Sequence, residues 1–376
     1  MPLTRIDLYE LALPLSEPFI ISGGTMTVRR SLVVALHDDA GHIGYGESPP
    51  FELPFYSEET LGTARQLLEQ VLIPRLLARA LDGPEQVDTL LQQNVRGNPF
   101  ARAALETAAW DLEAHRRNTG LAALLGERLG LAPAASIPCG VAFGIPSNRS
   151  LDTLRRWIDE ALPHGYRRVK IKIAPGWDAE PVRVARAALD GTGVPLTVDA
   201  NGGYDWPEHE PALRALDDAG LLYLEQPLAP DEILGHVRLS QTLRTPVCVD
   251  ETLHGARAGR QLLELDGPRV WNVKVHRMGG LTEVCRVVRL GREAGVRLWA
   301  GTMPESGLGS QAALAAAALP GFVYPSDVEP STRWFGPGVD VIELRMASDG
   351  TMPVPTTSIA HRLDDALFRR ASRRLH

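Results

Sequence analysis

The sequence predicts an α/β fold, a (β/α)8-type barrel that follows an N-terminal α+β domain. From about residue 136, short apolar runs alternate with amphipathic helical segments at a spacing of roughly 25–30 residues, as in repeated βαβ units. Several of these runs are apolar almost throughout, as expected of parallel strands buried on both faces. Before residue 130 the pattern differs, because alternating strand-like runs come first and helical segments follow.

The first domain is predicted over residues 1–130. Strand-like runs and then helical patterns occupy its main segments: 3–13, 30–37, 42–47, 57–81 and 98–117. Ser57 is the predicted N-cap of the first helix. Between Thr25 and Ser57 the chain is rich in glycine, proline and aromatic residues, which predicts long loops able to carry binding residues.

The barrel is predicted over residues 131–339. Eight apolar runs supply its strands: 136–143, 168–173, 195–200, 221–226, 246–251, 270–275, 296–301 and 321–325. Residues 339–355 predict a hairpin with a turn at Asp349-Gly350. We expect the C-terminal segment 340–376 to complete the first domain.

Composition narrows the possible partners and location. The net charge is 39 − 46 = −7, which argues against nucleic acid as a partner. No apolar run approaches the roughly 18 residues of a membrane span, so no membrane partner is expected. The N-terminus alternates like a strand, unlike a signal peptide. Three widely spaced cysteines show no metal-ligand spacing, and a reducing, cytoplasmic setting is expected.

Ionisable residues end five consecutive predicted strands. Lys170 and Lys172 alternate with apolar residues and therefore leave their strand on one face. The following strands end in further charged residues: Asp199, Glu225, Asp250 and Lys274. Starting from Lys172, each lies 27, 26, 25 and 24 residues after the one before it. In a barrel these groups would gather at the C-terminal rim, where barrel active sites lie.

Three neighbouring carboxylates repel one another unless a cation joins them. Oxygen ligands without histidine or cysteine favour a hard ion, Mg²⁺, for which Mn²⁺ or another divalent ion could substitute. Lysines beside such an ion suggest removal of a proton α to a substrate carboxylate, which gives an enediolate. Lys172 would be the base, and Lys170 would be the charged neighbour that lowers its pKa.

These motifs resemble the enolase superfamily, the muconate-lactonizing-enzyme subgroup, and within it the o-succinylbenzoate synthase/N-succinylamino acid racemase family. The resemblance spans essentially the whole chain. It rests on these stretches: "RRVKIKIAPGWD", "VDAN", "YLEQPL", "VCVDE", "NVKVHRMGG", "PFYSEET", "ARAALETAAWDLEA", "ESGLG" and "PSDVEPSTRWF". It implies an enolase-like modified TIM barrel with a capping domain, and a metal held by Asp199, Glu225 and Asp250.

The resemblance also implies roles for the lysines. For racemisation of an N-succinyl or other N-acylamino acid, Lys172 and Lys274 would exchange protons on opposite faces of the substrate. For o-succinylbenzoate synthesis, a dehydration in the menaquinone pathway, Lys172 would take the proton while Lys274 stays protonated. An arginine at the position of Arg277 is associated with racemase competence, and the alternative is a structural salt bridge to a helix carboxylate.

Further residues match supporting or substrate-binding positions of that family. They are Lys170, Asn201, Glu251, Met303, Glu305, Ser306, Phe19 and Tyr56. Loops around Phe19–Thr25 and Pro50–Tyr56 would close over a small-molecule carboxylate, and family members assemble as homo-oligomers, commonly dimers or octamers. Several positions depart from the family pattern and leave the substrate open: Ala142, Gly202, Gly203, Thr302, Pro304 and Ser310.

Other functions compete with this interpretation. A dipeptide epimerase, or another enzyme of the muconate-lactonizing subgroup, would share the lysines and the metal, but "YPSDVEP" lacks the Asp-x-Asp pair usual in such epimerases. A barrel glycoside hydrolase could use Glu225 and Asp250 as its acid/base pair, although it would not need two inward lysines. A non-catalytic scaffold is the third alternative.

Overall fold

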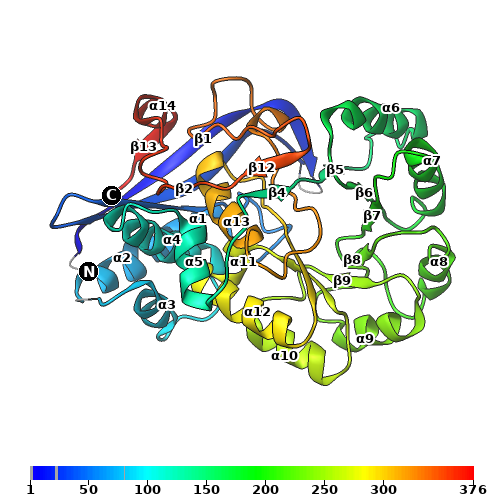
Figure 1. The fold of residues 1–376 in the computed structure, drawn as a ribbon, viewed down its shortest axis with the longest axis horizontal. Helices are drawn as coiled ribbons and strands as arrows, with labels where there is room; N and C mark the ends of the chain where they lie inside the picture. Colours follow the sequence, from blue (N-terminus) through cyan, green and yellow to red (C-terminus); the bar gives the residue numbers. More distant parts are fainter. Residues whose placement is uncertain (1–2, 22–23, 80) are drawn as a thin grey trace.

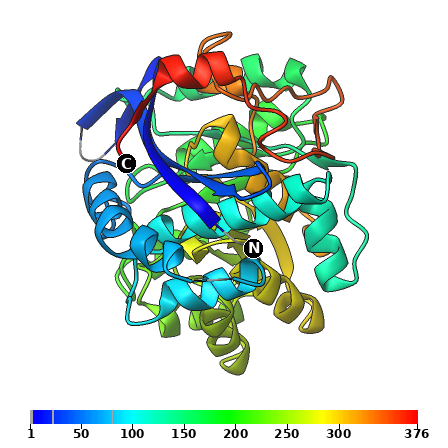
Figure 2. The same ribbon diagram turned by 90° about the vertical axis from the view of Figure 1, so that its left-hand side faces the viewer.

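The first part of the chain forms a four-stranded antiparallel sheet covered by helices. The computed structural model describes residues 3–21, 24–79 and 81–376. The sheet order is β13-β1-β2-β3, with these bounds: β1 Leu3–Ile21, β2 Gly24–Asp38, β3 Ile43–Ser48 and β13 Ser372–Arg374. Five helices follow β3 along the chain: α1 Leu61–Leu67, α2 Ile73–Leu77, α3 Pro84–Gln92, α4 Pro99–Arg116 and α5 Leu121–Leu129. Figure 2 shows the long β1–β2 ribbon between the C-terminal helix and the helices α1–α4.

Strands β1 and β2 are longer than predicted. The segment expected to be a loop at Phe19–Thr25 is the end of a β-hairpin, in which Phe19 pairs with Met26. A register irregularity between Pro14 and Phe19 lets the two strands resume pairing after the proline, which cannot donate to a ladder. Residues 22–23 of the expected loop lie outside the described residues.

The first predicted helix begins later and is interrupted. Thr60, not Ser57, is its N-cap and forms a capping box with Thr63. A π-helical segment, η1 Leu68–Leu72, separates α1 from α2. Pro74 follows directly and has no N–H to donate, so a local change of hydrogen-bonding pattern accommodates it.

Seven parallel strands form the barrel sheet, in the order β11-β10-β9-β8-β7-β6-β5. Their bounds are β5 Val141–Phe143, β6 Val169–Lys172, β7 Leu196–Asp199, β8 Leu224–Glu225, β9 Val247–Val249, β10 Val270–Val273 and β11 Arg297–Ala300. Helices succeed the strands along the chain: α6 Leu151–Ala161, α7 Ala179–Leu189, α8 Glu210–Ala215, α9 Ile233–Thr242, α10 Ala256–Glu264, α11 Val275–Met278, α12 Leu281–Glu293 and α13 Gly307–Ala317. Figure 1 shows α6–α10 around the outside of this sheet, on the side away from β1 and β2.

The eighth predicted strand is reduced to isolated bridges. Phe322 bridges Leu298 of β11, and Ser326 bridges Cys139. The backbone N–H of Val323 donates to Leu298 O at 2.9 Å, and that of Gly140 donates to Ser326 O at 2.8 Å. This irregular segment therefore hydrogen-bonds on both sides and occupies the eighth position of the barrel.

The hairpin predicted over residues 339–355 is wrong. The turn is present, because Gly350 has φ 76° and its N–H donates to Ala347 O at 3.0 Å. Across the turn the backbone pairing is limited to the N–H of Ala347, which donates to Thr351 O at 2.8 Å, and the ladder of β12 Thr351–Pro353 is formed with β4 Ser136–Pro138. Farther along, α14 Asp365–Ala371 leads into β13, which pairs with β1. The last residues therefore join the N-terminal sheet.

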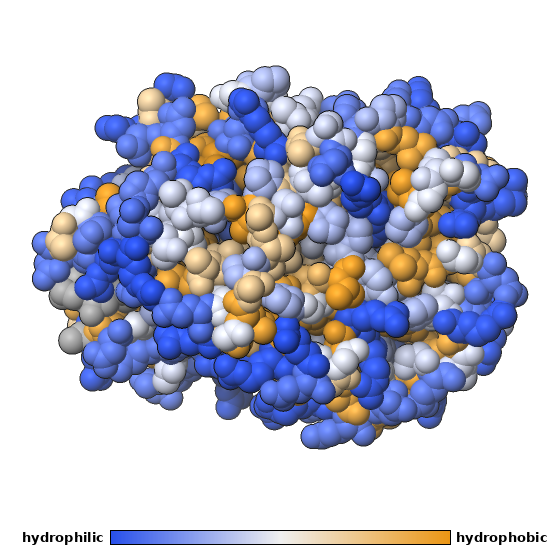
Figure 3. Space-filling view, viewed as in Figure 1, coloured by the Kyte–Doolittle hydropathy of each residue, from blue (hydrophilic) through white to orange (hydrophobic). Residues whose placement is uncertain are grey.

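The described surface is mixed in character. In Figure 3 hydrophilic side chains prevail around the rim of the visible face, and apolar ones lie between them. None of the helices in the described residues is long and apolar enough to cross a membrane. Cys139, Cys248 and Cys285 are buried free thiols.

Candidate active site

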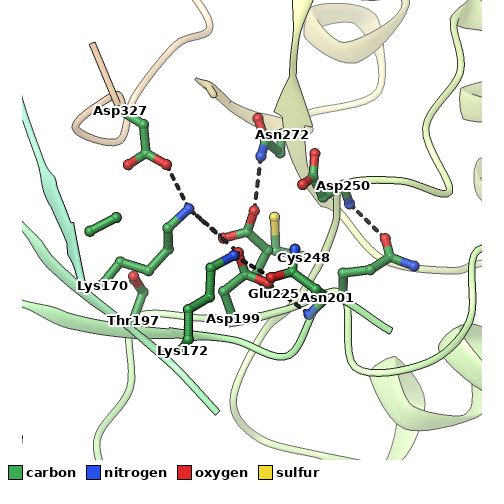
Figure 4. A network of polar contacts seen from close by, with 12 residues as sticks. Lys170, Lys172, Thr197, Asp199, Asn201, Glu225, Cys248, Asp250, Asn272 and Asp327 are labelled. Carbon is green, nitrogen blue, oxygen red and sulfur yellow. Dashed lines mark hydrogen bonds and ion pairs between the residues drawn. The ribbon is translucent and has the colours of Figure 1, made fainter. Parts of the chain in front are cut away.

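Parallel pairing brings the predicted site residues side by side at the ends of the barrel strands. Lys172 of β6 is in register with Asp199 of β7, and Asp199 with Glu225 of β8. Asp250 follows β9 directly, and Lys274 follows β10. Figure 4 shows Lys170 and Lys172 pointing toward Asp199 and Glu225 in one polar network, with Asp250 beside it. The sheet order places three acid-bearing strands between the two lysine-bearing strands.

Lys170 is a buried cation tied to acids. Its Nζ lies 2.6 Å from Asp327 Oδ2, 3.1 Å from Glu225 Oε2 and 3.6 Å from Asp199 Oδ2. Burial disfavours the ammonium, but these carboxylates outweigh it and raise the pKa of Lys170 well above its usual range. Lys170 therefore remains charged at neutral pH.

Lys172 is the more accessible lysine of the strand, with 31% of its side chain exposed against 5% for Lys170. Its Nζ lies 2.6 Å from Asp199 Oδ2 and also donates to Asn201 Oδ1. Asn201 in turn donates from Nδ2 to Glu251 Oε1 at 3.0 Å. The predicted supporting residues Asn201 and Glu251 thus orient groups around Lys172.

Lys274 lies on the opposite side of the row of acids. Its Nζ is 2.9 Å from Asp250 Oδ2 and 3.0 Å from the hydroxyl of Tyr56, which precedes α1 in the first domain. Burial disfavours the ammonium, but Asp250 outweighs it and raises the pKa of Lys274 above its usual range. In this arrangement, Lys274 is protonated.

Arg277 on α11 shares the partners of Lys274. Its guanidinium donates to Asp250 Oδ1, to the Tyr56 hydroxyl at 3.2 Å and to Asn272 O at 2.8 Å. The salt bridge of Arg277 is therefore to the strand-end acid Asp250 and not to a helix carboxylate. Arg277 and Lys274 therefore contact the same carboxylate, that of Asp250.

The three predicted ligands, Asp199, Glu225 and Asp250, are fully or almost fully buried. Burial and the charge of Asp199 raise the pKa of Glu225 to about 8. Burial and the charge of Asp250 raise the pKa of Glu251 to about 7, and its buried Oε2 has no hydrogen-bond partner among the residues that the structure describes. Buried, mutually repelling oxygen ligands with an unpartnered carboxylate oxygen fit a hard divalent cation.

In this structure the carboxylates of Asp199, Glu225 and Asp250 are not arranged as a metal-binding site. Over residues 3–21, 24–79 and 81–376, no three histidine, cysteine or acidic side chains form a group that could hold an ion as they stand. Each of the three acids is instead paired with a lysine: Asp199 with Lys172, Glu225 with Lys170 and Asp250 with Lys274. The ligand assignment stays a prediction.

The predicted substrate-side residues lie where the first domain meets the barrel. Met303 packs with Phe51 and Phe100, and Tyr56 lies against this cluster. Ser306 caps α13 and donates to Glu47 Oε2 at 2.5 Å. Glu305 is buried with an unpartnered Oε1, and the ring of Phe19 packs edge-on against Trp334 at 5.4 Å.

Known families and proteins match nearly the whole chain. The N-terminal domain of mandelate racemase/muconate lactonizing enzymes matches residues 5–126, and an enolase C-terminal domain-like family matches residues 153–358. An N-succinylamino acid racemase of Thermus thermophilus is 41% identical over 94% of this chain and 93% of that protein. An o-succinylbenzoate synthase of Enterococcus faecalis is 36% identical over 94% of both chains.

A solved structure agrees with these matches. It is described as an unknown member of the enolase superfamily from Enterococcus faecalis V583, and it is 35% identical with a TM-score of 0.90 over 100% of this chain and 99% of that one. The chain belongs to the enolase superfamily. Its relatives place it in the muconate-lactonizing-enzyme subgroup, and it is an enzyme, a lyase or an isomerase. This overrules the glycoside hydrolase and scaffold alternatives.

Three residues in contact with this row of charges were missed by the sequence prediction: Arg168, Asn272 and Asp327. Asp327 binds Lys170 and Arg168, and Asn272 Nδ2 donates to Glu225 Oε1 at 2.8 Å. Two of these residues could have been predicted, because side chains two residues apart in a strand lie on the same face. Arg168 precedes Lys170 by two residues and Asn272 precedes Lys274 by two, so each shares a face with its lysine.

The lysine content of this superfamily member is unusual. The chain has 39 lysine and arginine residues, and only three of them, Lys170, Lys172 and Lys274, are lysines, which leaves 39 − 3 = 36 arginines. All three lysines lie at the strand ends of the candidate active site. Elsewhere the strongly basic residues are arginines. An arginine side chain stays protonated and cannot serve as a base near neutral pH.

Proposed function

We propose that this enzyme removes the proton α to the carboxylate of a small substrate in a Mg²⁺-dependent reaction. It would act as an o-succinylbenzoate synthase, an N-succinyl/N-acylamino acid racemase, or both. The observation that carries the proposal is the placement of Lys172 and Lys274 on either side of a row of three buried acids. The names of the two relatives described above support the substrate class.

The acids would hold the metal. Asp199, Glu225 and Asp250 are the proposed ligands of Mg²⁺, with Mn²⁺ or another divalent ion as a substitute. When bound, such an ion supplies the positive charge that stabilises an enediolate. The acids now attract the three lysines; with a divalent cation among them, this attraction is weaker and a lysine can lose its proton more easily.

The two lysines would divide the proton transfers. Lys172 is the more exposed amine and would serve one face of the α-carbon, while Lys274 beneath Tyr56 would serve the other. In racemisation one lysine takes the proton and the other delivers one. In o-succinylbenzoate synthesis Lys172 takes the proton and then assists loss of hydroxide, and Lys274 remains an ammonium group.

Proton exchange in D₂O tests the proposal. N-succinyl amino acids of each hand are incubated with Mg²⁺ and the wild type, Lys172→Ala or Lys274→Ala, and loss of the α-proton signal is followed by NMR. Each variant should lose exchange with one enantiomer preferentially. Arg155→Ala, on the exposed face of α6, is the matched control and should exchange both enantiomers like the wild type. Exchange that survives both lysine changes would contradict the mechanism.

A parallel assay separates the two reactions. Formation of o-succinylbenzoate from its hydroxycyclohexadiene carboxylate precursor reports the synthase. Turnover of N-succinyl amino acids alone would assign the racemase.

The proposal extends to assembly and location. From the family resemblance, we infer a homo-oligomer, a dimer or an octamer, in the cytoplasm. Light scattering coupled to size-exclusion chromatography would measure the assembly directly, and a single monomer mass would contradict it.

A further inference from the structure

Arg29 of β2 is a buried arginine whose five N–H donors are all used on backbone carbonyls. Nε donates to Pro304 O at 3.0 Å, and Nη1 donates to Arg30 O at 2.7 Å and to Pro50 O at 3.2 Å. Nη2 donates to Pro49 O and, at 3.0 Å, to Met303 O. A guanidinium has five such donors in a fixed fork, so this side chain is fully satisfied.

Four of these five carbonyls belong to two loops from different parts of the fold. Pro49 and Pro50 begin the segment 49–56 that follows β3, which we call the cap loop. Met303 and Pro304 lie in the segment 302–306 between β11 and α13, which we call the barrel loop. One side chain, 2% exposed, therefore ties the two loops to each other.

The charge of Arg29 is held without a direct ion pair. Within the part of the chain that the structure describes, no acidic oxygen lies within ion-pair distance of its guanidinium, although Phe51 stacks against it with the ring centroid 4.8 Å from Cζ. Burial lowers the pKa of Arg29 to about 10, and the more distant Glu47 and Glu305 partly offset this, so the group is charged at neutral pH. A buried charge that relies on carbonyl dipoles demands that those carbonyls stay in place.

Both loops reach the reacting groups. In the cap loop, Phe51 packs with Met303 of the barrel loop, and Tyr56 lies against this pair. The Tyr56 hydroxyl then accepts a hydrogen bond from Lys274 Nζ at 3.0 Å. A contiguous chain of contacts thus runs from Arg29 through the two loops to a proposed catalytic lysine.

We propose that Arg29 is a positioning residue that locks the cap loop onto the barrel loop and so fixes the wall that holds the non-reacting part of the substrate. This inference rests on the proposed function for the identity of the substrate, but not for the lock itself. A wall that touches the substrate equally in the ground state and the transition state changes KM more than kcat.

Three variants test the lock. Arg29→Lys keeps the charge but has three donors at one point and cannot span the four loop carbonyls. Arg29→Met removes the charge and all donors. Arg75→Lys is the matched control, because Arg75 also donates to backbone carbonyls, Leu90 O and Gln93 O, but it does so between helices of the first domain away from the site.

Amide hydrogen exchange of the unliganded protein is the first measurement. Arg29→Lys should accelerate exchange at least tenfold in residues 51–56 of the cap loop and 302–306 of the barrel loop and leave helix α5 unchanged, whereas Arg75→Lys should leave both loops as in the wild type. Should Arg29→Met fail to fold, Arg29→Lys alone decides the question. Unchanged exchange in both loops of Arg29→Lys would overturn the proposal.

Steady-state kinetics with N-succinyl amino acids is the second measurement. Arg29→Lys should raise KM about tenfold or more while kcat changes by less than about threefold, and Arg75→Lys should change neither. A fall in kcat with KM unchanged would overturn the positioning role. If the wild type turns over neither these substrates nor the o-succinylbenzoate precursor, the proposed function has failed, and hydrogen exchange still decides whether Arg29 locks the loops.

Discussion

The hydroxyl of Tyr56 lies 3.0 Å from Nζ of Lys274, so a residue of the first domain contacts a lysine at the end of a barrel strand. The same hydroxyl accepts a hydrogen bond from Arg277 at 3.2 Å. Burial, followed by the charge of Asp250, raises the pKa of Tyr56 to about 12, which keeps the phenol neutral. The first domain thus supplies a neutral acceptor to two cations of the site.

Tyr56→Phe should act on one face of the substrate. Loss of the acceptor removes a hydrogen bond to a charged group, which is worth about 1.5–3 kcal/mol and corresponds to roughly ten- to a hundredfold. We expect α-proton exchange in D₂O to slow by about that factor for the enantiomer served by Lys274, and by much less for the other. Tyr324→Phe, which loses a comparable bond to Arg297 away from the site, is the control. Equal slowing of both enantiomers would contradict the assignment.

A reagent that acylates amines should label side chains only in the candidate active site, because the chain has only three lysines and all of them lie there. The side chain of Lys172 is 31% exposed, against 5% for Lys170 and 10% for Lys274. Brief treatment with an acylating reagent, followed by peptide mass spectrometry, should modify Lys172 before the other two. Lys172→Arg should leave the N-terminal amine as the main labelled group. Fastest labelling at Lys170 would be inconsistent with its burial.

Asp327→Asn should destabilise the fold, because Asp327 neutralises two buried cations, Arg168 and Lys170. Loss of one partner of a buried pair costs about 3–5 kcal/mol, and we expect that loss in the free energy of unfolding at pH 7. Urea unfolding measures it. Asp159→Asn, in an exposed pair with Arg155, is the control and should cost under about 1 kcal/mol.

The effect of Asp327→Asn should also depend on pH. Burial alone would raise the pKa of Asp327, but Arg168 and Lys170 outweigh it and hold that pKa below its usual range. A depressed carboxyl pKa contributes stability above the unfolded-state pKa, and this contribution is lost as the pH falls through the folded-state value. The difference between the variant and the wild type should therefore shrink below about pH 4. A constant difference would contradict the ion-pair explanation.

Glu106→Gln should change the pH dependence of stability in the opposite sense. Glu106 of α4 is buried and accepts hydrogen bonds from the N–H groups of Leu281 and Thr282 at the start of α12, at 2.6 and 2.8 Å. Burial raises its pKa from 4.5 to about 7. A raised pKa gives stability that is present below the unfolded-state value and lost as the pH rises through the folded-state value.

The variant lacks this titration. Between pH 4.5 and 7 the wild type should therefore lose about 3 kcal/mol relative to Glu106→Gln, measured by urea unfolding at a series of pH values. Glu113→Gln on the same helix, an acid near Arg116, is the control for the loss of one carboxylate. Parallel curves for Glu106→Gln and the wild type would refute the prediction.

The barrel strands were predictable because buried parallel strands are continuous apolar runs. Seven of the eight predicted runs contain a strand of the sheet. The eighth, at 321–325, makes only isolated bridges, and its closure of the barrel depends on tertiary hydrogen bonds that no local pattern encodes. The same reason explains the failed hairpin, since the ladder of β12 is formed with β4, about 210 residues earlier in the chain, and the pairing across the turn ends after Ala347 and Thr351.

The candidate site was predictable where charge interrupts an apolar strand, as at Lys170, Lys172 and Asp199. Arg29 was not, because a charged residue in an alternating strand ordinarily faces solvent, and its burial arises from carbonyls of distant loops. Asp327 was not, because its partners come from β6 and its neighbour Arg168. In each case the role of the charged side chain depends on the residues that contact it in the folded structure.

The pairing of β13 with β1 sets an order on biosynthesis. Residues Tyr9–Leu11 find their partners at Arg374–Ser372, so this edge of the first sheet cannot be completed until residues 372–374 have left the ribosome. Until then β1 offers an unpaired strand edge, the kind of surface that other chains can join. A polypeptide interrupted shortly before residue 372 would keep every proposed catalytic group and still expose that edge, so loss of residues 372–374 should appear first as aggregation in the cell and only then as lost turnover.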